Sequence, residues 1–326
     1  MKGSYEIKVS NARLSYKFTI NRNITILRGD SATGKTTLID MLLSYQNNGP
    51  DSGVDVQSPK PCVVLTQPNW QIILRSINDS IVFIDEGCAF VSDHEFARMI
   101  QESSNYYVIA TRTSLFNLPY SIQEVYGIKN TSGNRYQGTK RLYSEFYPLH
   151  SEQPSIIENP DCVIVEDSNS GYEFFRAVFQ KNGIPCFSAE GKSKIFEAVL
   201  RSNFKNILVI ADGAAFGAEM NRVLSLRQVK NVILFLPESF EWLILKSDLL
   251  KNIDVRKILN SPSDYIDSEL FFSWERYFSR LLVEESNGTY LHYSKSELNP
   301  VYLQPHEASA IMVNIPPIKV KESTTE

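Results

Sequence analysis

The feature that most constrains the fold is a glycine-rich turn between an apolar strand and a helix. Residues 24–43 read ITILRGDSATGKTTLIDMLL and contain the pattern G-x-x-x-x-G-K-T. Gly29 and Gly34 let the backbone curl, so that successive N–H groups and the start of the helix can surround an anion. A strand before the turn and a helix after it are the context that this pattern requires. The sequence therefore predicts an α/β sheet with a polyphosphate site at its edge.

The expected role of each residue in this turn follows from the chemistry of a nucleoside triphosphate. Lys35 is expected to reach the β and γ phosphates as a catalytic group, and Thr36 to offer its hydroxyl to Mg²⁺. Thr37 is expected to start the helix without competing for the metal. The alternative is a turn that binds nothing. The residues expected to bind the nucleotide are Gly29, Asp30, Ser31, Ala32, Thr33, Gly34, Lys35, Thr36 and Thr37.

A second motif follows at ordinary spacing. Residues 80–86 read SIVFIDE, in which an apolar run leads directly into two acids. A strand buried on both faces delivers such acids to the carboxyl edge of a parallel sheet. Asp85 is expected to hold Mg²⁺ through water, and Glu86 to polarise the water that attacks the γ-phosphate. The alternative is a strand that simply ends in a solvated acidic turn.

Arg112 is the internal arginine best placed to contact a γ-phosphate, because it follows the strand-like run YYVIAT. The alternative is a surface arginine that pairs with a nearby acid. Arg28 directly precedes the glycine-rich turn, but the sequence does not indicate where its side chain points, and we assign it no role.

Length and composition bound the class of protein. A chain of 326 residues is long enough for two domains, and its 43% hydrophobic and 21% charged residues are typical of a globular fold. No apolar run is long enough to span a membrane and the N-terminus lacks a signal-peptide core, so we expect a cytoplasmic protein without membrane contact. The four cysteines are expected to be free thiols. The formal charge of −4 gives no general attraction to nucleic acid, although a local basic patch would still allow that partner.

The order of strand-like and helix-like segments predicts three regions: 1–145, 146–260 and 261–326. In the first, an antiparallel pair is expected over 5–20, and further strands over 62–67, 81–86, 106–111 and 124–129. A helix is expected after Ser92, which we predict as its N-cap, with Glu95 completing a capping box. Residues 130–160 are rich in turn formers and are expected to be a boundary. The last region is expected to be a helical extension with a tail.

The second region shows another series of alternating strands and helices, in which Glu166 closes the run VIVE and Asp212 closes VIAD. These runs resemble the Toprim domain of primases, topoisomerases and old-family nucleases, in which such acids hold Mg²⁺ for phosphodiester chemistry. The resemblance implies a metal site at Glu166 and Asp212. It is incomplete, because Ala214 replaces the second aspartate and Asp167 replaces a glycine. Residues that could substitute for the missing acid are Asp167, Glu219 and Glu238.

A P-loop NTPase followed by a Toprim-like module resembles the old-family ATPase-nucleases of phage defence and mobile elements. That resemblance is partial, because 49 residues separate Lys35 from Asp85, without the LSGGQ-type signature of those relatives. It implies ATP with Mg²⁺ as cofactors, and no N-K-x-D motif for guanine is present. Three functions stay open: an ATPase whose nucleotide state controls the attached module, an ATP-gated nuclease acting through Glu166 and Asp212, and a nucleotide-switched protein that binds a protein or nucleic-acid partner. The oligomeric state stays open as well.

Overall fold

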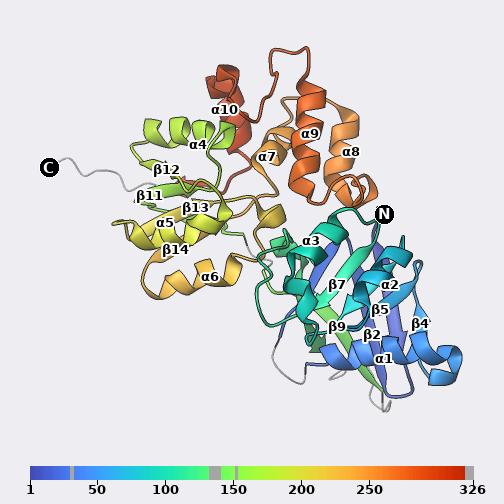
Figure 1. Cartoon of the computed structure of the whole chain (residues 1–326). Coiled ribbons are helices and arrows are strands. Elements are labelled where there is room, and N and C mark those ends of the chain that lie inside the picture. Colours follow the sequence, from blue (N-terminus) through green and yellow to red (C-terminus); the bar gives the residue numbers. More distant parts are fainter. Residues whose placement is uncertain (30–32, 132–140, 151–152, 320–326) are drawn as a thin grey trace. The chain divides into compact units, whose positions relative to one another are not determined.

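The computed structural model describes residues 1–29, 33–131, 141–150 and 153–319, which form an α/β fold with one large, mostly parallel sheet and smaller sheets (Figure 1). Contacts divide the chain into two compact units, one of Met1–Ser151 with Ser261–Phe272 and one of Glu152–Asn260 with Ser273–Glu326. The stretch 261–326 is therefore divided between the units. In the first unit, the N-terminal ammonium of Met1 donates to Asp267 Oδ1 at 2.8 Å, which connects the second segment of this unit to residue 1.

The first unit is built on one extended sheet. Its strands are β1 (Tyr5–Ser10), β2 (Leu14–Ile20), β3 (Ile24–Leu27), β4 (Asp55–Gln57), β5 (Cys62–Leu65), β6 (Ile81–Ile84), β7 (Tyr106–Ala110), β8 (Val125–Asn130) and β9 (Leu142–Pro148). In the part of the chain that the structure describes, these nine strands lie in the order β4-β1-β2-β9-β8-β3-β7-β6-β5. β3, β5, β6 and β7 pair in parallel, and β1 and β2 form the expected antiparallel pair.

Helices cover both faces of this sheet. They are α1 (Lys35–Asn48), α2 (Trp70–Ser76) and α3 (His94–Gln101). On one face, Leu38 and Leu42 of α1 join a core cluster that includes Phe83 of β6. On the other, Trp70 of α2 and Phe96 of α3 belong to an aromatic cluster with Phe90 and Tyr107. This double coverage explains why β3, β6 and β7 are buried along their whole length.

Strand β9 corrects a sequence-based expectation. It lies inside the stretch 130–160 that was expected to be a boundary, and it pairs in parallel with β2 and antiparallel with β8. The strand is half-exposed and includes the charged Glu145 and the polar Ser144, so it lacks the long apolar run of a buried strand. Its place in the sheet comes from distant contacts, such as the stacking of Phe146 on Phe18 at 4.0 Å between ring centroids.

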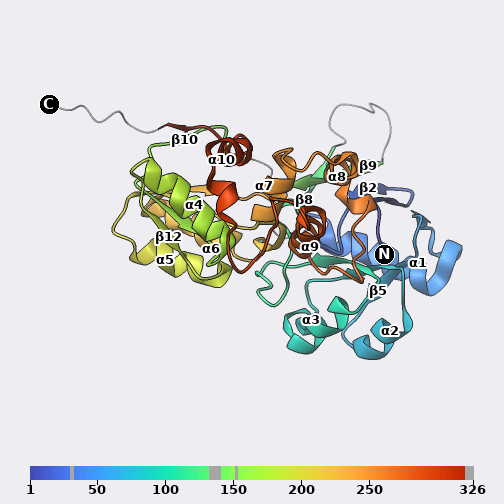
Figure 2. The same ribbon diagram turned by 90° about the horizontal axis from the view of Figure 1, so that it is seen from above.

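The second unit is a smaller α/β layer. Its strands β11 (Cys162–Val165), β12 (Cys186–Ser188), β13 (Asn206–Ile210) and β14 (Asn231–Phe235) are all parallel, in the order β12-β11-β13-β14. Its helices are α4 (Ser170–Lys181), α5 (Ile195–Arg201), α6 (Met220–Ser225), α7 (Phe240–Lys246), α8 (Ile253–Asn260), α9 (Trp274–Ser286) and α10 (Pro305–Met312). A short parallel pair joins β10 (Ile157–Glu158) to β15 (Ile318–Lys319). Figures 1 and 2 show α10 beside α4, so residues near the C-terminus complete this unit.

Among the described residues, no helix has both the length and the apolar character needed to cross a membrane.

Candidate functional site

The glycine-rich turn connects β3 to α1 as the motif predicts. Gly29 has φ 143° and Gly34 has φ 93°, a region of backbone conformation that side chains disfavour. At Gly34 a Cβ atom would also lie 2.9 Å from the hydroxyl oxygen of Tyr16. Both glycines are therefore required by the shape of the turn. Three of the expected nucleotide-binding residues, Asp30, Ser31 and Ala32, lie outside the described residues.

Lys35 is the first residue of α1 and is held inside the turn. Its side chain is buried, with an exposed fraction of 4%. The Nζ atom donates to the carbonyl oxygen of Gly29 at 2.6 Å and to Thr33 Oγ1 at 3.2 Å. The Tyr16 hydroxyl donates to the carbonyl oxygen of Gly34 at 3.2 Å and so supports the end of the turn. The sequence gives no signal for Tyr16, which reaches the turn from β2.

The two expected metal ligands of the first unit meet at the carboxyl edge of the sheet. Thr36 Oγ1 donates to Asp85 Oδ1 at 3.4 Å, although the two residues are 49 positions apart in the sequence. Hydroxyl and carboxylate oxygens are groups that bind Mg²⁺, directly or through water. The two residues therefore fit the expected site, in which the Thr36 hydroxyl would bind Mg²⁺ and Asp85 would hold it through water. Thr37, the next residue of α1, is exposed.

Glu86 and Arg112 form an ion pair at the same edge. They follow β6 and β7, which are neighbours in the sheet, so their side chains reach each other across one strand spacing. The exposed fraction is 28% for Glu86 and 57% for Arg112, so solvent screens this pair. This pair is the alternative that the sequence leaves open for Arg112, a surface arginine that pairs with a nearby acid.

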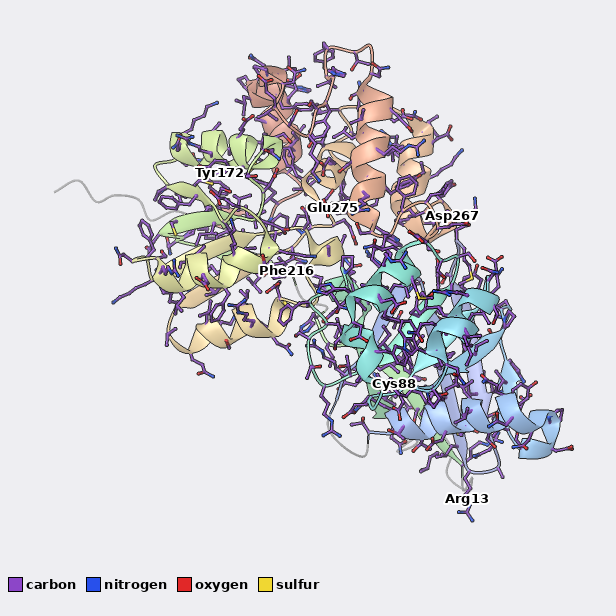
Figure 3. The ribbon with its side chains drawn as sticks, in the orientation of Figure 1. Arg13, Cys88, Tyr172, Phe216, Asp267 and Glu275 are labelled. Carbon is purple, nitrogen blue, oxygen red and sulfur yellow. The ribbon has the colours of Figure 1, made fainter. Side chains whose placement is uncertain are left out.

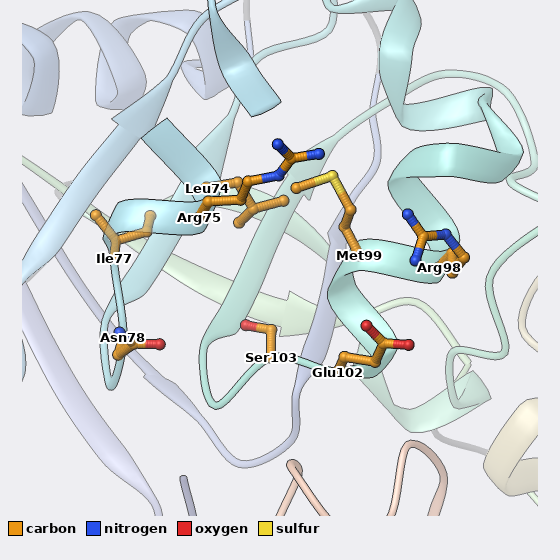
Figure 4. Close-up of a pocket in the computed structure, with 8 residues that line it drawn as sticks. All are labelled: Leu74, Arg75, Ile77, Asn78, Arg98, Met99, Glu102 and Ser103. Atoms are coloured by element: carbon orange, nitrogen blue, oxygen red, sulfur yellow. The ribbon is translucent and has the colours of Figure 1, made fainter. Parts of the chain in front are cut away.

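A polar pocket of ≈ 350 Å³ lies between α2 and α3 (Figure 4). Its lining includes the exposed side chains of Arg75 and Arg98. Ile77 and Ser103, which also line it, precede β6 and β7, whereas Asp85 and Glu86 follow β6. The pocket is therefore at the opposite edge of the parallel strands from the glycine-rich turn. Each arginine lies in the last turn of its helix, where a cation stabilises the exposed carbonyls.

In the second unit, the structure brings Glu166 and Asp212 together. They follow the neighbouring strands β11 and β13, and Glu166 Oε2 accepts a hydrogen bond from the backbone N–H of Asp212 at 2.9 Å. Burial raises the pKa of Glu166 to about 7. The hydrogen bond from Asp212 lowers this pKa, and the charge of Glu275 raises it further. Burial also raises the pKa of Asp212, as do Glu275 and Glu166. The two carboxyl groups thus disfavour charge on each other.

Residues from the C-terminal part of the chain surround this carboxyl pair, and the sequence did not indicate them. Glu275, which Figure 3 labels, accepts a hydrogen bond from Lys295 Nζ at its Oε1 atom, at 2.8 Å. The hydroxyl of Tyr293 donates to Glu241 Oε1 at 2.9 Å. Although burial lowers the pKa of Lys295, Glu275 and Glu241 raise it, and the net shift is upward. The cluster therefore contains its own permanent cation.

The residues that could replace the missing second aspartate have other surroundings. The Asp167 carboxylate accepts backbone N–H groups of Ser168, Asn169 and Gly171, at the start of α4. Ala214 is buried, and burial raises the pKa of Glu219 against the charges of Arg222 and Lys192. The Asp167 carboxylate therefore binds backbone N–H groups at the start of α4. The carboxyl group of Glu219 is partly removed from solvent.

These observations do not fit a divalent metal in the second unit. Within residues 1–29, 33–131, 141–150 and 153–319, no three His, Cys, Asp or Glu side chains form a metal-binding group, either in the first unit or beside Glu166 and Asp212. The space beside Glu166 and Asp212 is ≈ 10 Å³, which is about the room for one water molecule. An ammonium group, Lys295, already compensates the acids. We therefore derive no metal chemistry for this unit.

The raised pKa of Glu166 predicts how stability depends on pH. Its pKa rises from 4.5 in the unfolded chain to about 7, so the folded state binds more protons between these values. The free energy of unfolding should therefore fall as the pH rises from 4.5 to 7, by at most about 3 kcal/mol from this group. Denaturant unfolding at pH 5 and pH 7.5 measures this, and Glu166→Gln should flatten the dependence. An equal pH dependence in the variant would show that Glu166 is not responsible.

Comparison with known proteins finds no matching family, no matching curated protein and no matching solved structure. The function of the chain therefore has to be argued from its own residues.

Proposed function

We propose that the first unit binds a nucleoside triphosphate with Mg²⁺ and hydrolyses it. The observation that carries this proposal is the meeting of Thr36 Oγ1 and Asp85 Oδ1 at 3.4 Å beside the buried ammonium of Lys35. A hydroxyl, a carboxylate and an ammonium at one helix start are the groups that a Mg²⁺–triphosphate requires. Either motif alone occurs by chance, but their convergence from positions 49 residues apart is specific.

Each residue then has one task. The glycine-rich motif is expected to offer backbone N–H groups to the phosphates. Lys35 would exchange its bonds to Gly29 and Thr33 for bonds to phosphate oxygens. Mg²⁺ between Thr36 and Asp85 would neutralise charge that develops on the phosphates. Glu86 orients and polarises the attacking water once its carboxylate leaves Arg112, and the guanidinium of Arg112 is then able to contact the γ-phosphate.

We further propose that the nucleotide is ATP, that its state controls the second unit as a Toprim-like module, and that the protein acts in the cytoplasm. The sequence supports ATP by resemblance and by the lack of a guanine-reading motif. The four cysteines are free thiols, which fits a reducing compartment. The nuclease alternative, acting through Glu166 and Asp212, has less support, because burial disfavours the charged form of both acids and the nearby ammonium of Lys295 is paired with Glu275. In the alternative of a nucleotide-switched binding protein, the first unit binds the nucleotide without enzymatic activity and the second unit binds a protein or nucleic acid.

Asp85→Asn tests the metal part of this proposal. The substitution keeps the size of the side chain but removes the charge that holds Mg²⁺, so the stimulation of triphosphate binding by Mg²⁺ should fall by roughly tenfold. Isothermal titration of ATP, with and without Mg²⁺, measures the ratio for both proteins. Asp93→Asn, at an exposed residue before α3, is the matched control and should leave the ratio unchanged. Equal Mg²⁺ dependence of Asp85→Asn and the parent chain would contradict the metal site.

A further inference from the structure

Arg28 is a buried arginine directly before the glycine-rich turn. Its exposed fraction is 6%. The preceding residue, Leu27, belongs to the core cluster that contains α1, so the alternation of a strand directs Arg28 to the opposite face of the sheet. There its Nη2 atom donates to Ser114 Oγ and to the hydroxyl oxygen of Tyr120, both at 3.0 Å. Arg28 thus leaves the turn on the side away from Lys35.

The charge of Arg28 lacks an acidic partner among the described residues. Its Nε and Nη1 atoms are buried there without a hydrogen-bond partner, and so is Nε2 of His150. Burial lowers the pKa of His150, and the charge of Arg28 lowers it further, so this charge acts on the imidazole. A buried guanidinium is always charged, and burying it without an anion is strongly unfavourable. Such a group in a native fold therefore calls for a ligand that supplies negative charge.

Every polar group around this point can donate a hydrogen. The hydroxyls of Ser114 and Tyr120 accept from Arg28, so their own hydrogens are available for another acceptor. Neutral His150 can donate from Nε2 as well. We propose that Arg28, Ser114, Tyr120 and His150 form a binding site for a compact oxyanion, such as a phosphate group, separate from the triphosphate site at Lys35. The buried positive charge of Arg28 opposes a cation as the ligand.

The test uses the full chain with Lys35→Ala, in which phosphate binding at the turn is weakened. Isothermal titration with inorganic phosphate should still detect one binding event in this variant. Adding Arg28→Met should weaken that event by at least about tenfold, because charge-assisted hydrogen bonds are lost. Adding Arg75→Met instead, at an exposed arginine of the same unit, should leave it unchanged. Phosphate binding that is equal with and without Arg28→Met would overturn the proposal.

A second measurement does not depend on the folding of the Arg28 variant. In the Lys35→Ala chain, inorganic phosphate should raise the pKa of His150, because an adjacent anion favours the imidazolium form. Proton NMR of the four histidines, assigned with His150→Gln, measures this shift. A similar shift with adenosine monophosphate would identify a phosphate group of a larger ligand, and a shift with inorganic phosphate alone would identify a free oxyanion. No shift with either compound would contradict the site, while leaving the triphosphate proposal untouched.

Discussion

Replacing Lys35 by alanine is expected to weaken binding of Mg²⁺–ATP by about 100-fold. The ammonium group is buried inside the turn and bonds to Gly29 and Thr33, so it is already positioned at the place where phosphate oxygens would lie. Alanine removes a charge-assisted hydrogen bond from a partly desolvated site, and no other described lysine lies within the motif to replace it. Equilibrium titration with a fluorescent ATP analogue measures the loss.

Two controls separate this effect from a change in folding. Lys17→Ala removes an exposed lysine of β2 that pairs with Glu6, and it should leave nucleotide binding unchanged. Thermal unfolding of Lys35→Ala without nucleotide reports whether the turn itself is loosened. Binding of ATP with unchanged affinity by a folded Lys35→Ala chain would refute the proposed triphosphate site.

The parts of the fold that the sequence predicts are those set by local patterns. The strand β3, the turn and α1 follow each other directly, and the two glycines are needed by the backbone at their own positions. Runs of apolar residues likewise predict β5, β6, β7 and β8 near their observed bounds, because these strands are buried or half-buried. The meeting of Thr36 with Asp85 follows from two parallel strands that end at one sheet edge.

The parts that could not be predicted depend on contacts between distant residues. β9 has no apolar run, and its position comes from pairing with β2 and β8. Lys295 carries no motif, yet it joins Glu275 beside the acids of the second unit. The predicted cap of α3 was wrong, since the helix begins at His94 with Asp93 as its N-cap and without a side-chain cap bond. Ser92 is instead the last residue of a short 3₁₀ helix, Ala89–Ser92. A capping-box pattern does not show whether such a serine ends a 3₁₀ helix or caps the next α-helix.

The second large effect is expected from Glu86→Gln. Glutamine keeps the shape of the side chain but cannot polarise water as a carboxylate does, so the rate of ATP hydrolysis should fall by about 10²- to 10⁴-fold. Binding of ATP should be retained, since Glu86 is not placed to contact the phosphates that Lys35 and the turn hold. Single-turnover hydrolysis and equilibrium binding, measured on the same preparation, separate the two quantities.

The pairing of Glu86 with Arg112 makes this prediction more specific. Because both side chains are partly exposed, losing the ion pair should change stability little, and the variant should fold. Glu95→Gln, at an exposed acid of α3, is the matched control and should hydrolyse ATP at the parent rate. If Glu86→Gln also keeps the parent rate while Asp85→Asn loses Mg²⁺ dependence, the metal site is right and the water is polarised by another group. If Glu86→Gln instead loses binding and hydrolysis together, this acid supports the phosphate site through Arg112, and its assignment as the base is wrong.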